Sequence, residues 1–585
     1  MKDETCANEP LVSEPAAIFG SKARIEKLVT RYWAEAVVVA IALLVWAPRL
    51  TGPLDLRWDG GVYYVLGTSL ATGHGYRILS EPGSPEGVEY PPLLPAVVAS
   101  AEWLLGTTSP DVVAPWLRKL YVVIFMAYAL AVLALAKRYL RPGLALAATT
   151  LCLLQIMTIF LSDLLFAELP FALVSVVFAF ITVDGPLASR AWLREAMSFV
   201  LAAAGFLLRT AGVVLFAAWV LEALTRRRWR LVLARIALAL LPIIAWQGYV
   251  ARVQGSYQYA HPAYEYQRAP YQNYNVGYWE NILLLDPFRP EKGLLDRRTL
   301  VTRVVKNLSE MPAALGGAVS TMSGYWGMFV RDILYSLRGM VVIQRYVIWV
   351  PIYGLATLVL GGFAIFLLRR DWVMVSIPLL SLGLVCLTPW PEEFRRYLMP
   401  IAPFLAIAAI LAWDQIQAVI RAAWVWIRAL VPVSILGLLL LAFTVQIYAA
   451  FSAFHVRGAP FAPGKGDKGK VRFFYHDNSW RAWEQAASWI GAHAAPSEIV
   501  ATIAPHQLYL RTGLRSVYPP MEANPEKARR LLEAVPISYV IVDEFRYRDF
   551  SRRYARPAVE GDPVGWPLVY SVKGTKVYQH VTGAQ

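Results

Sequence analysis

Residues 57–64 read Arg-Trp-Asp-Gly-Gly-Val-Tyr-Tyr and closely follow the first long apolar segment of this 585-residue chain. The carboxylate of Asp59 is therefore expected where a membrane helix meets water. Ionisable groups at membrane depth are costly, and they usually line a cavity or take part in function. Capping of a helix is the alternative role for such a carboxylate. Asp59 is the first candidate functional residue, and the remaining sequence indicates what surrounds it.

The composition is that of a polytopic membrane protein with an aqueous part, since 57% of the residues are hydrophobic and 21 are Trp. The net charge of +15 comes largely from short basic clusters between apolar segments, such as residues 226–230. Such clusters are typical of topology signals, so we exclude nucleic-acid binding. The three cysteines, Cys6, Cys152 and Cys386, provide neither a disulfide framework nor a cysteine metal site.

Hydropathy predicts eleven membrane spans, nine of which are close to the length that a bilayer requires, while two are shorter. A continuous helix over residues 195–224 would leave Arg209 near the middle of the membrane, at a cost of roughly 2.5 to 3.5 kcal/mol. We therefore predict two short legs that turn at residues 208–212. The predicted spans lie near residues 34–50, 112–136, 143–161, 164–183, the two legs within 195–224, 231–251, 341–368, 373–390, 397–418 and 430–451.

The apolar stretch over residues 91–106 is short and contains Pro95 and Glu102, so we expect it to lie flat at the interface; a true span is the alternative. With the flat arrangement, basic clusters place the N-terminus in the cytoplasm of an inner (plasma) membrane. The predicted outer segments are 51–111, a turn near 162, the turn at Arg209, 252–340, 391–396 and 452 to the end. The candidate charged residues then share the outer side.

The chain divides into a polar tail (1–33), a membrane domain (34–451) and an aqueous domain (452–585). The first apolar segment follows a long polar tail, so we expect a retained anchor. The outer loop 252–340 is rich in Tyr, which predicts either a functional lid or an aromatic collar at the membrane surface. A Gly/Lys/Pro-rich linker at 458–470 precedes a small α/β unit with predicted helices at 479–493, 506–511 and 525–534 and strands at 498–503, 537–542, 568–571 and 576–580. We expect this unit to be structural or to bind the acceptor.

An ordered set of motifs accompanies Asp59: Tyr63-Tyr64, Glu89-Tyr90-Pro91-Pro92-Leu93, Asp163, Arg209 in an outer turn and Arg395-Arg396-Tyr397-Leu398-Met399-Pro400. With the α/β tail, this set resembles the GT-C membrane glycosyltransferases of the family 39 type, particularly protein O-mannosyltransferases and lipid A aminoarabinose transferases. The chain departs from that pattern in three places. Gly60 stands where a second acidic residue is common, and Tyr90 and Arg209 stand where lysines are usual.

The resemblance implies an enzyme that moves a monosaccharide from a polyprenyl-phosphate carrier to a hydroxyl group of a lipid, glycan or protein, with inversion at the sugar carbon. Asp59 would be the general base, because a hydroxyl acceptor has to lose its proton. Arg209, with Arg395 and Arg396 as second candidates, would bind the lipid phosphate, since a guanidinium suits phosphate. Anchoring to lipid headgroups is the alternative for these arginines.

Five further residues are candidates for contact with the sugar, the acceptor or a divalent cation. Glu89 and Asp163 could bind such a cation, and Glu168, Tyr63 and Tyr64 could contact the sugar or the acceptor. The alternatives are a helix N-cap at Asp163 and an internal hydrogen-bonding group at Glu168. The seven histidines show no paired spacing for zinc.

Two other functions remain compatible with these motifs. The chain could be a transporter or flippase of lipid-linked saccharides, although it lacks the internal repeat that many transporters have. It could also be a saccharide polymerase or ligase that uses lipid-diphosphate donors.

Overall fold

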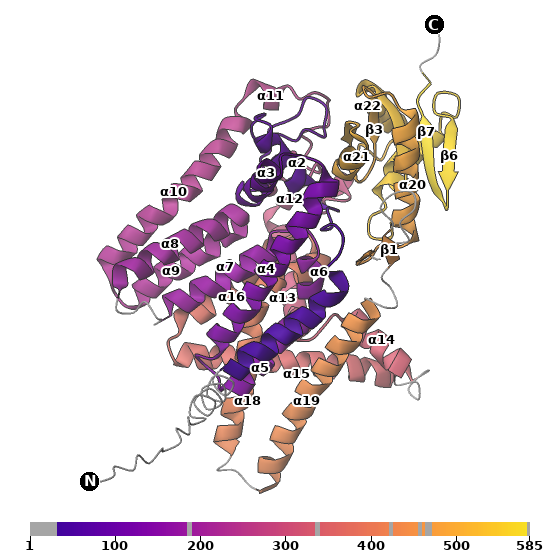
Figure 1. The fold of residues 1–585 in the computed structure, drawn as a ribbon. Helices are drawn as coiled ribbons and strands as arrows, with labels where there is room; N and C mark the ends of the chain where they lie inside the picture. The colour runs from indigo at the N-terminus through magenta and orange to yellow at the C-terminus, as the bar shows by residue number, and fades with distance from the viewer. Residues whose placement is uncertain are drawn as a thin grey trace, which may run out of the picture.

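The computed structural model describes residues 32–183, 190–333, 340–420, 425–453, 459–461 and 471–581. The predicted tail 1–33 lies outside these ranges except for its last two residues, and so does most of the predicted linker 458–470. Figure 1 shows a body of long helices, with a small α/β domain built from the C-terminal part of the chain beside one end.

Seven helices in the described ranges are long and apolar enough to cross a membrane, or eight if one bent pair counts as a span. The seven are Tyr32–Arg49, α4 (Pro110–Ala136), α8 (Ala191–Leu208), α10 (Trp229–Gln254), Ile343–Leu368 within α15 (Val341–Leu368), Pro391–Ile420, and Leu430–Phe451 within α19 (Val425–Phe451). The segment Pro391–Ile420 consists of η5 (Pro391–Glu393), α17 (Phe394–Leu398), η6 (Met399–Ile401) and α18 (Ala402–Ile420). The bent pair is α5 (Pro142–Leu154) and α6 (Ile156–Ser162), which meet at 58°.

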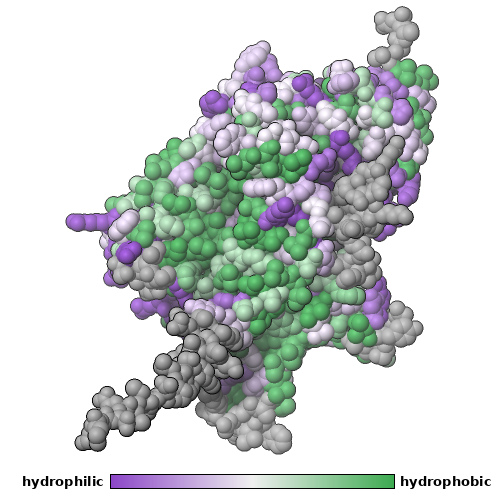
Figure 2. All heavy atoms as spheres, in the orientation of Figure 1, coloured by the Kyte–Doolittle hydropathy of each residue, from purple (hydrophilic) through white to green (hydrophobic). Residues whose placement is uncertain are grey.

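All eleven predicted spans coincide with apolar helices. The seven long helices and the bent pair account for eight of them, and three shorter helices account for the others: α7 (Glu168–Thr182), α9 (Val213–Thr225) and α16 (Trp372–Leu387). The predicted segments are therefore found, but by length alone only seven or eight of them qualify as spans. Large apolar side chains such as Leu233 and Leu368 are exposed on the helical body. Figure 2 shows hydrophobic residues covering this body and polar residues gathered at the end with α11 (Tyr257–Ala260) and the α/β domain. The chain is a multi-pass membrane protein.

The turn predicted between residues 208 and 212 is present. Helix α8 ends at Leu208, Arg209 is extended, and the 3-10 turn η2 (Thr210–Gly212) leads into α9. The turn is tight because Gly212 lies against the backbone of Gly205, where an added Cβ would come within 2.3 Å of a carbonyl carbon. Arg209 is thereby held at the tip of a hairpin whose legs are apolar.

The polar end of the helical body is built from α2 (Asp59–Ala71), α3 (Leu93–Leu105), α11 (Tyr257–Ala260), α12 (Tyr278–Ile282) and η3 (Pro290–Lys292). Helix α3 has 13 residues, about 20 Å, which is too short for a bilayer. It packs closely on α2, where a Cβ on Gly67 would lie 2.6 Å from the Cβ of Val98. The outer segment 252–340 continues with the helices α13 (Arg297–Val319) and α14 (Ser323–Ile333).

The C-terminal domain is an α/β unit, as predicted. Its elements are β1 (Ala459–Phe461), β2 (Val471–Phe473), α20 (Asn478–His493), β3 (Ile499–Ala501), α21 (Pro505–Thr512), β4 (Ser516–Val517), α22 (Pro525–Ala534), β5 (Ile537–Val542), η8 (Ser551–Ala555), α23 (Arg556–Glu560), β6 (Leu568–Val572) and β7 (Thr575–Gln579). Five strands form a sheet of order β4-β3-β5-β7-β6, in which β3 is parallel to β4 and β5, and β7 is antiparallel to β5 and β6. The short strands β1, β2 and β4 and the short helices η8 and α23 were not predicted.

This domain docks directly on the loop that follows α2. The backbone amide of Ser516 donates to the carbonyl of Ser80 at 2.8 Å, and the hydroxyl of Ser80 lies 2.7 Å from Nδ1 of His506. Tyr264 and Tyr266 of the 252–340 segment are buried in the core of the domain. Much of the Tyr-rich segment is therefore packed inside the protein and does not form a lipid-facing collar. The docking brings the domain to the edge of the cavity described next.

Candidate functional site

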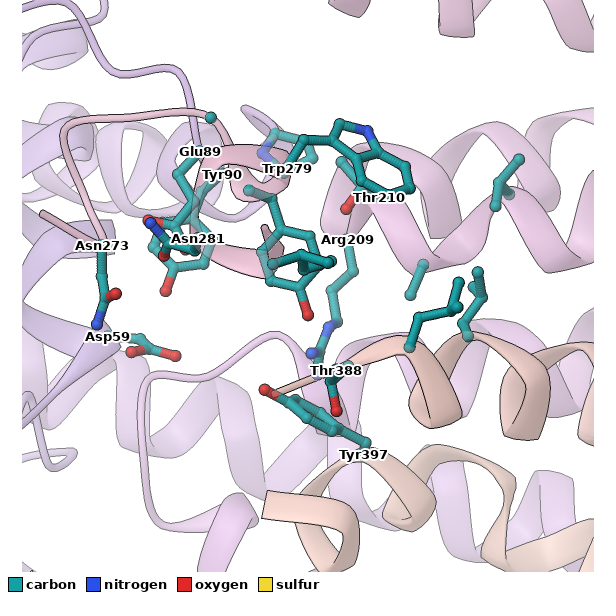
Figure 3. Close-up of a pocket in the computed structure, with 18 of the residues that line it drawn as sticks. Asp59, Glu89, Tyr90, Arg209, Thr210, Asn273, Trp279, Asn281, Thr388 and Tyr397 are labelled. Carbon is teal, nitrogen blue, oxygen red and sulfur yellow. The ribbon is translucent and has the colours of Figure 1, made fainter. Parts of the chain in front are cut away.

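A cavity of about 500 Å³ opens at the polar end of the helical body. Its walls come from α2, the segment before α3, the α8–α9 hairpin, α10, α12 and the segment before it, the end of α16, α17 and the loop after β5. In Figure 3 the side chains of Asp59 and Arg209 reach into this space from different elements. Most of the segments predicted to share one side of the membrane therefore meet at one site.

Asp59 is the first residue of α2, where the partial positive charge of a helix N-terminus favours a carboxylate. The preceding loop is held by backbone hydrogen bonds of 3.0 Å, from Asp55 N to the carbonyl of Asp163 and from Leu165 N to the carbonyl of Asp55. A Cβ on Gly60 would lie 3.3 Å from the same carbonyl of Asp55. A second acidic residue at position 60 would thus press on this loop, which accounts for one departure from the family 39 pattern.

Arg396 of α17 connects two acidic residues at the site. Its guanidinium forms ion pairs with the carboxylates of Asp59 and Glu168, and Glu168 also binds Nη1 of Arg209 at 2.6 Å. Glu168 is fully buried and begins α7. Two carboxylates thus balance two guanidinium groups, as a buried ionic cluster requires.

The protonation of Asp59 and Glu89 differs although both line the cavity. Burial raises the pKa of Asp59, but the charge of Arg396 and hydrogen bonds from Arg396 and Tyr274, the latter at 3.0 Å, outweigh burial and lower it below its usual value. Burial and the charge of Asp59 raise the pKa of Glu89 well above its usual value. Asp59 is therefore ionised, and Glu89 tends to be neutral.

Aromatic side chains complete the wall beside these carboxyl groups. The rings of Tyr63 and Tyr90 are 4.6 Å apart, and Tyr90 lies 6.1 Å from Tyr274. Tyr90 stands where the family pattern has a lysine, so this wall carries a phenol in place of a cation. Oε2 of Glu89 has no hydrogen-bond partner among the residues that the structure describes. The wall thus offers a polar atom to a ligand.

Three of the predicted site residues, Asp163, Arg395 and Tyr64, neither line the cavity nor, among the described residues, form ion pairs with the residues that line it. Asp163 is buried in a separate ion cluster, 3.0 Å from Nη1 of Arg118 and 3.6 Å from Nη1 of Arg49. Its carbonyl accepts the hydrogen bond from Asp55 N that holds the loop before Asp59, so Asp163 supports the site from outside the cavity. Arg395 contacts the sulfur of Met322 at 3.2 Å. The hydroxyl of Tyr64 donates to the carbonyl of Thr108 at 3.0 Å.

Of the remaining predicted residues, Asp59, Tyr63, Glu89, Arg209 and Arg396 line the cavity, and Glu168 joins them through its two ion pairs. Of the two residues predicted as possible cation ligands, Glu89 borders the cavity and Asp163 does not. In the part of the chain that the structure describes, no group of three or more His, Cys, Asp or Glu side chains is arranged to hold a metal ion.

The cavity residues that were not predicted from the sequence include Tyr274, Glu393 and Arg548. Tyr274 is one of many tyrosines in its segment, and no pattern distinguishes it. Arg548 follows strand β5 in a domain whose contact with the membrane part is not encoded by any local motif. Only the run of two acidic residues before Phe394 could have indicated Glu393.

No family model and no curated protein matches this sequence. Solved structures do. The oligosaccharyltransferase AglB from Archaeoglobus fulgidus, in complex with an inhibitory peptide and a dolichol-phosphate, aligns with a TM-score of 0.52 at 13% identity over 95% of this chain and 75% of that chain. The oligosaccharyltransferase of the same organism tethered with an acceptor peptide gives a TM-score of 0.54 at 13% identity, with the same shares covered.

ArnT from Cupriavidus metallidurans bound to undecaprenyl phosphate aligns with a TM-score of 0.50 at 13% identity over 94% of this chain and 99% of that chain. At such identities the likeness concerns the fold. These neighbours are GT-C proteins, so the fold expected from the motifs is confirmed.

Proposed function

We propose that this chain, which has the GT-C membrane fold, is a glycosyltransferase that moves a monosaccharide from a polyprenyl-phosphate carrier to a hydroxyl acceptor. The observation that carries the proposal is the cavity in which ionised Asp59 stands beside Arg209 and Arg396. The neighbours bound to dolichol-phosphate and undecaprenyl phosphate support the class of donor. We place the reaction at the outer face of an inner membrane, with the N-terminus cytoplasmic and the C-terminal domain periplasmic.

The proposed reaction assigns one task to each charged group. The acceptor oxygen forms a bond with the anomeric carbon of the sugar while the bond from that carbon to the phosphate oxygen breaks. The proton of the acceptor passes to Asp59, and the polyprenyl phosphate departs with the bonding electron pair. Arg209 and Arg396 hold the phosphate and neutralise the charge that develops on it. Attack opposite the leaving group inverts the anomeric carbon.

Binding of the donor would also activate the base. Once a phosphate also binds the guanidinium of Arg396, this guanidinium stabilises the carboxylate of Asp59 less strongly. The carboxylate then loses part of its cationic partner and gains an anionic neighbour, and both changes raise its pKa. Arg396 thus couples occupation of the phosphate site to the basicity of Asp59.

This coupling predicts a difference between two pH profiles. In the free protein the pKa of Asp59 is lowered, so the base form persists above that pKa and is lost only as the pH falls through it. The acid limb of kcat/KM should therefore lie below about pH 4, and that of kcat, which reports the donor complex, should lie at higher pH. Transfer rates measured from pH 3.5 to 8 with varied donor concentration test this; coincident limbs would contradict the coupling.

Arg209 gives a second prediction, on donor binding. The Arg209→Gln variant should raise KM for the polyprenyl-phosphate donor by about tenfold or more, because a charge-assisted hydrogen bond to phosphate is lost. Arg209→Lys should retain part of the affinity, since lysine is usual in the family pattern. Exposed Arg228, at the other end of the hairpin, gives the control Arg228→Gln. An equal KM for the donor in Arg209→Gln, Arg209→Lys and Arg228→Gln would contradict the assignment of Arg209 to the phosphate site.

The overall proposal is tested with purified protein, radiolabelled polyprenyl-phosphate sugars and hydroxyl acceptors of the lipid, glycan and protein classes. Transfer to any acceptor supports it. A requirement for diphosphate-linked oligosaccharides would instead identify a polymerase or ligase. Movement of a lipid-linked sugar across vesicles with no sugar transfer would identify a flippase.

A further inference from the structure

Arg548 is the one cation at the cavity wall that comes from the C-terminal domain among the described residues. Its guanidinium lies over the ring of Phe288, 4.7 Å from the centroid. Within the described residues it has no hydrogen bond and no ion pair, whereas Arg209 and Arg396 both bind Glu168. Because this cation is partly removed from water and forms no ion pair among the described residues, an anionic ligand would gain a charge-assisted contact there.

The loop that carries Arg548 is held rigidly. Arg552 donates to the carbonyls of Asp543 and Phe545 at 2.8 and 2.7 Å. The ring of Phe545 lies 4.3 Å from that of Trp480, and the ring of Phe550 stacks on Phe288 at 6.3 Å. Arg548 is therefore presented to the cavity by a fixed frame and is not a free surface side chain.

The position of Arg548 assigns it to the acceptor side of the site. Arg209 lies at the tip of the apolar hairpin, where a polyprenyl chain would arrive from the membrane, and Arg548 comes from the aqueous domain. Asp59 lines the same cavity as both arginines, and the charge of Arg548 acts on its carboxylate. The hydroxyl that gives its proton to Asp59 should thus approach past Arg548.

His506 and Glu393 do not change this assignment. Burial lowers the pKa of His506 to about 3, so the imidazole beside this wall is neutral. The carboxyl group of Glu393 borders the cavity, but among the described residues it forms no ion pair with Arg548. The guanidinium therefore keeps its positive charge available to a ligand.

Resting on the proposed function, we propose that Arg548 binds an anionic group, a phosphate or a carboxylate, on the acceptor, and that the enzyme therefore selects acidic glycan or lipid acceptors over neutral ones. The planar guanidinium pairs with either anion through two hydrogen bonds, and Phe288 supports its face.

The test measures binding to full-length protein in detergent, first saturated with undecaprenyl phosphate. Methyl glucoside 6-phosphate and neutral methyl glucoside are titrated by calorimetry. The wild-type protein should bind the phosphorylated probe at least about tenfold more tightly than the neutral one. Arg548→Gln should abolish this preference and Arg548→Lys should keep part of it. The exposed cation of the same loop provides the matched control Arg546→Gln, which should keep all of it.

Two outcomes would overturn the inference: an equal preference in Arg548→Gln and wild type, or no preference in wild type. A preference that vanishes when undecaprenyl phosphate is added would place the anion in the donor site and overturn the acceptor assignment. Thermal unfolding of each variant shows whether it is folded, and Arg548→Lys decides the question if Arg548→Gln is not. Failure of undecaprenyl phosphate to bind would count against the proposed function alone, because the probes can be titrated without it.

Discussion

The Asp59→Asn variant is expected to lose about 10²- to 10⁴-fold in the rate of sugar transfer, the contribution of a positioned general base. The amide has nearly the shape of the carboxylate and can still face Tyr274, but it cannot take the acceptor proton. The affinity for polyprenyl phosphate should change much less than the rate, because Arg209 and Arg396 keep Glu168 as partner. Single-turnover transfer and equilibrium binding of the donor lipid, measured on the same preparations, separate the two effects.

A control for this variant is Asp111→Asn, since Asp111 is an exposed carboxylate at the start of α4, outside the cavity. It should transfer sugar at the wild-type rate. If the Asp59→Asn protein kept more than a tenth of the wild-type transfer rate, the assignment of Asp59 as the general base would be wrong. A variant that loses donor binding together with the rate would indicate that Asp59 mainly orders Arg396.

Sequence reasoning located the membrane helices and the hairpin well because both follow from local physical costs. An apolar segment of bilayer length has few alternatives, and a guanidinium such as that of Arg209 has to reach the membrane surface. The α/β domain was also largely predictable, since its strands and helices alternate in clear hydrophobic patterns. The unpredicted β4 (Ser516–Val517) has only two residues, too few for a pattern to show.

The site was predictable only in part, because ion pairing depends on side-chain direction. Arg395 and Arg396 are adjacent in the sequence, yet one meets Met322 and the other meets Asp59, since consecutive residues of a helix point about 100° apart. Asp163 has the expected residue type and depth, but two buried arginines already neutralise it. No spacing rule distinguishes such a structural carboxylate from a ligand-binding one.

Arg548 illustrates a second limit. It lies 489 positions after Asp59 in the sequence, and the docking surface that brings the two together consists of single contacts, such as Ser80 with His506 and Trp58 with Trp480, whose rings are 5.7 Å apart. Each contact is unremarkable in the sequence. A site that is completed by a second domain becomes visible only when the two domains are seen together.

The Glu168→Gln variant should show the largest loss of stability of any single change at the site, about 3 to 5 kcal/mol. The carboxylate of Glu168 is fully buried and is the acidic partner of both Arg209 and Arg396. Its removal leaves two guanidinium groups with Asp59 alone, and an uncompensated buried charge is far more costly than a lost surface ion pair. The thermal unfolding temperature of the purified protein should fall accordingly.

Two matched variants separate this charge effect from a simple loss of packing. Glu35→Gln breaks an ion pair of 2.6 Å with Lys137 in which both side chains are about one quarter to one third exposed, and it should cost about 0 to 1 kcal/mol. The double variant Glu168→Gln/Arg209→Gln removes one positive charge along with the negative one, so it should unfold at a higher temperature than Glu168→Gln alone. Additive losses in the double variant would mean that Glu168 stabilises the protein through packing and not by neutralising the arginines. Recovery of stability without recovery of sugar transfer would show that the protein needs Glu168 to keep two cations together in the cavity, where the phosphate of the donor is expected to bind.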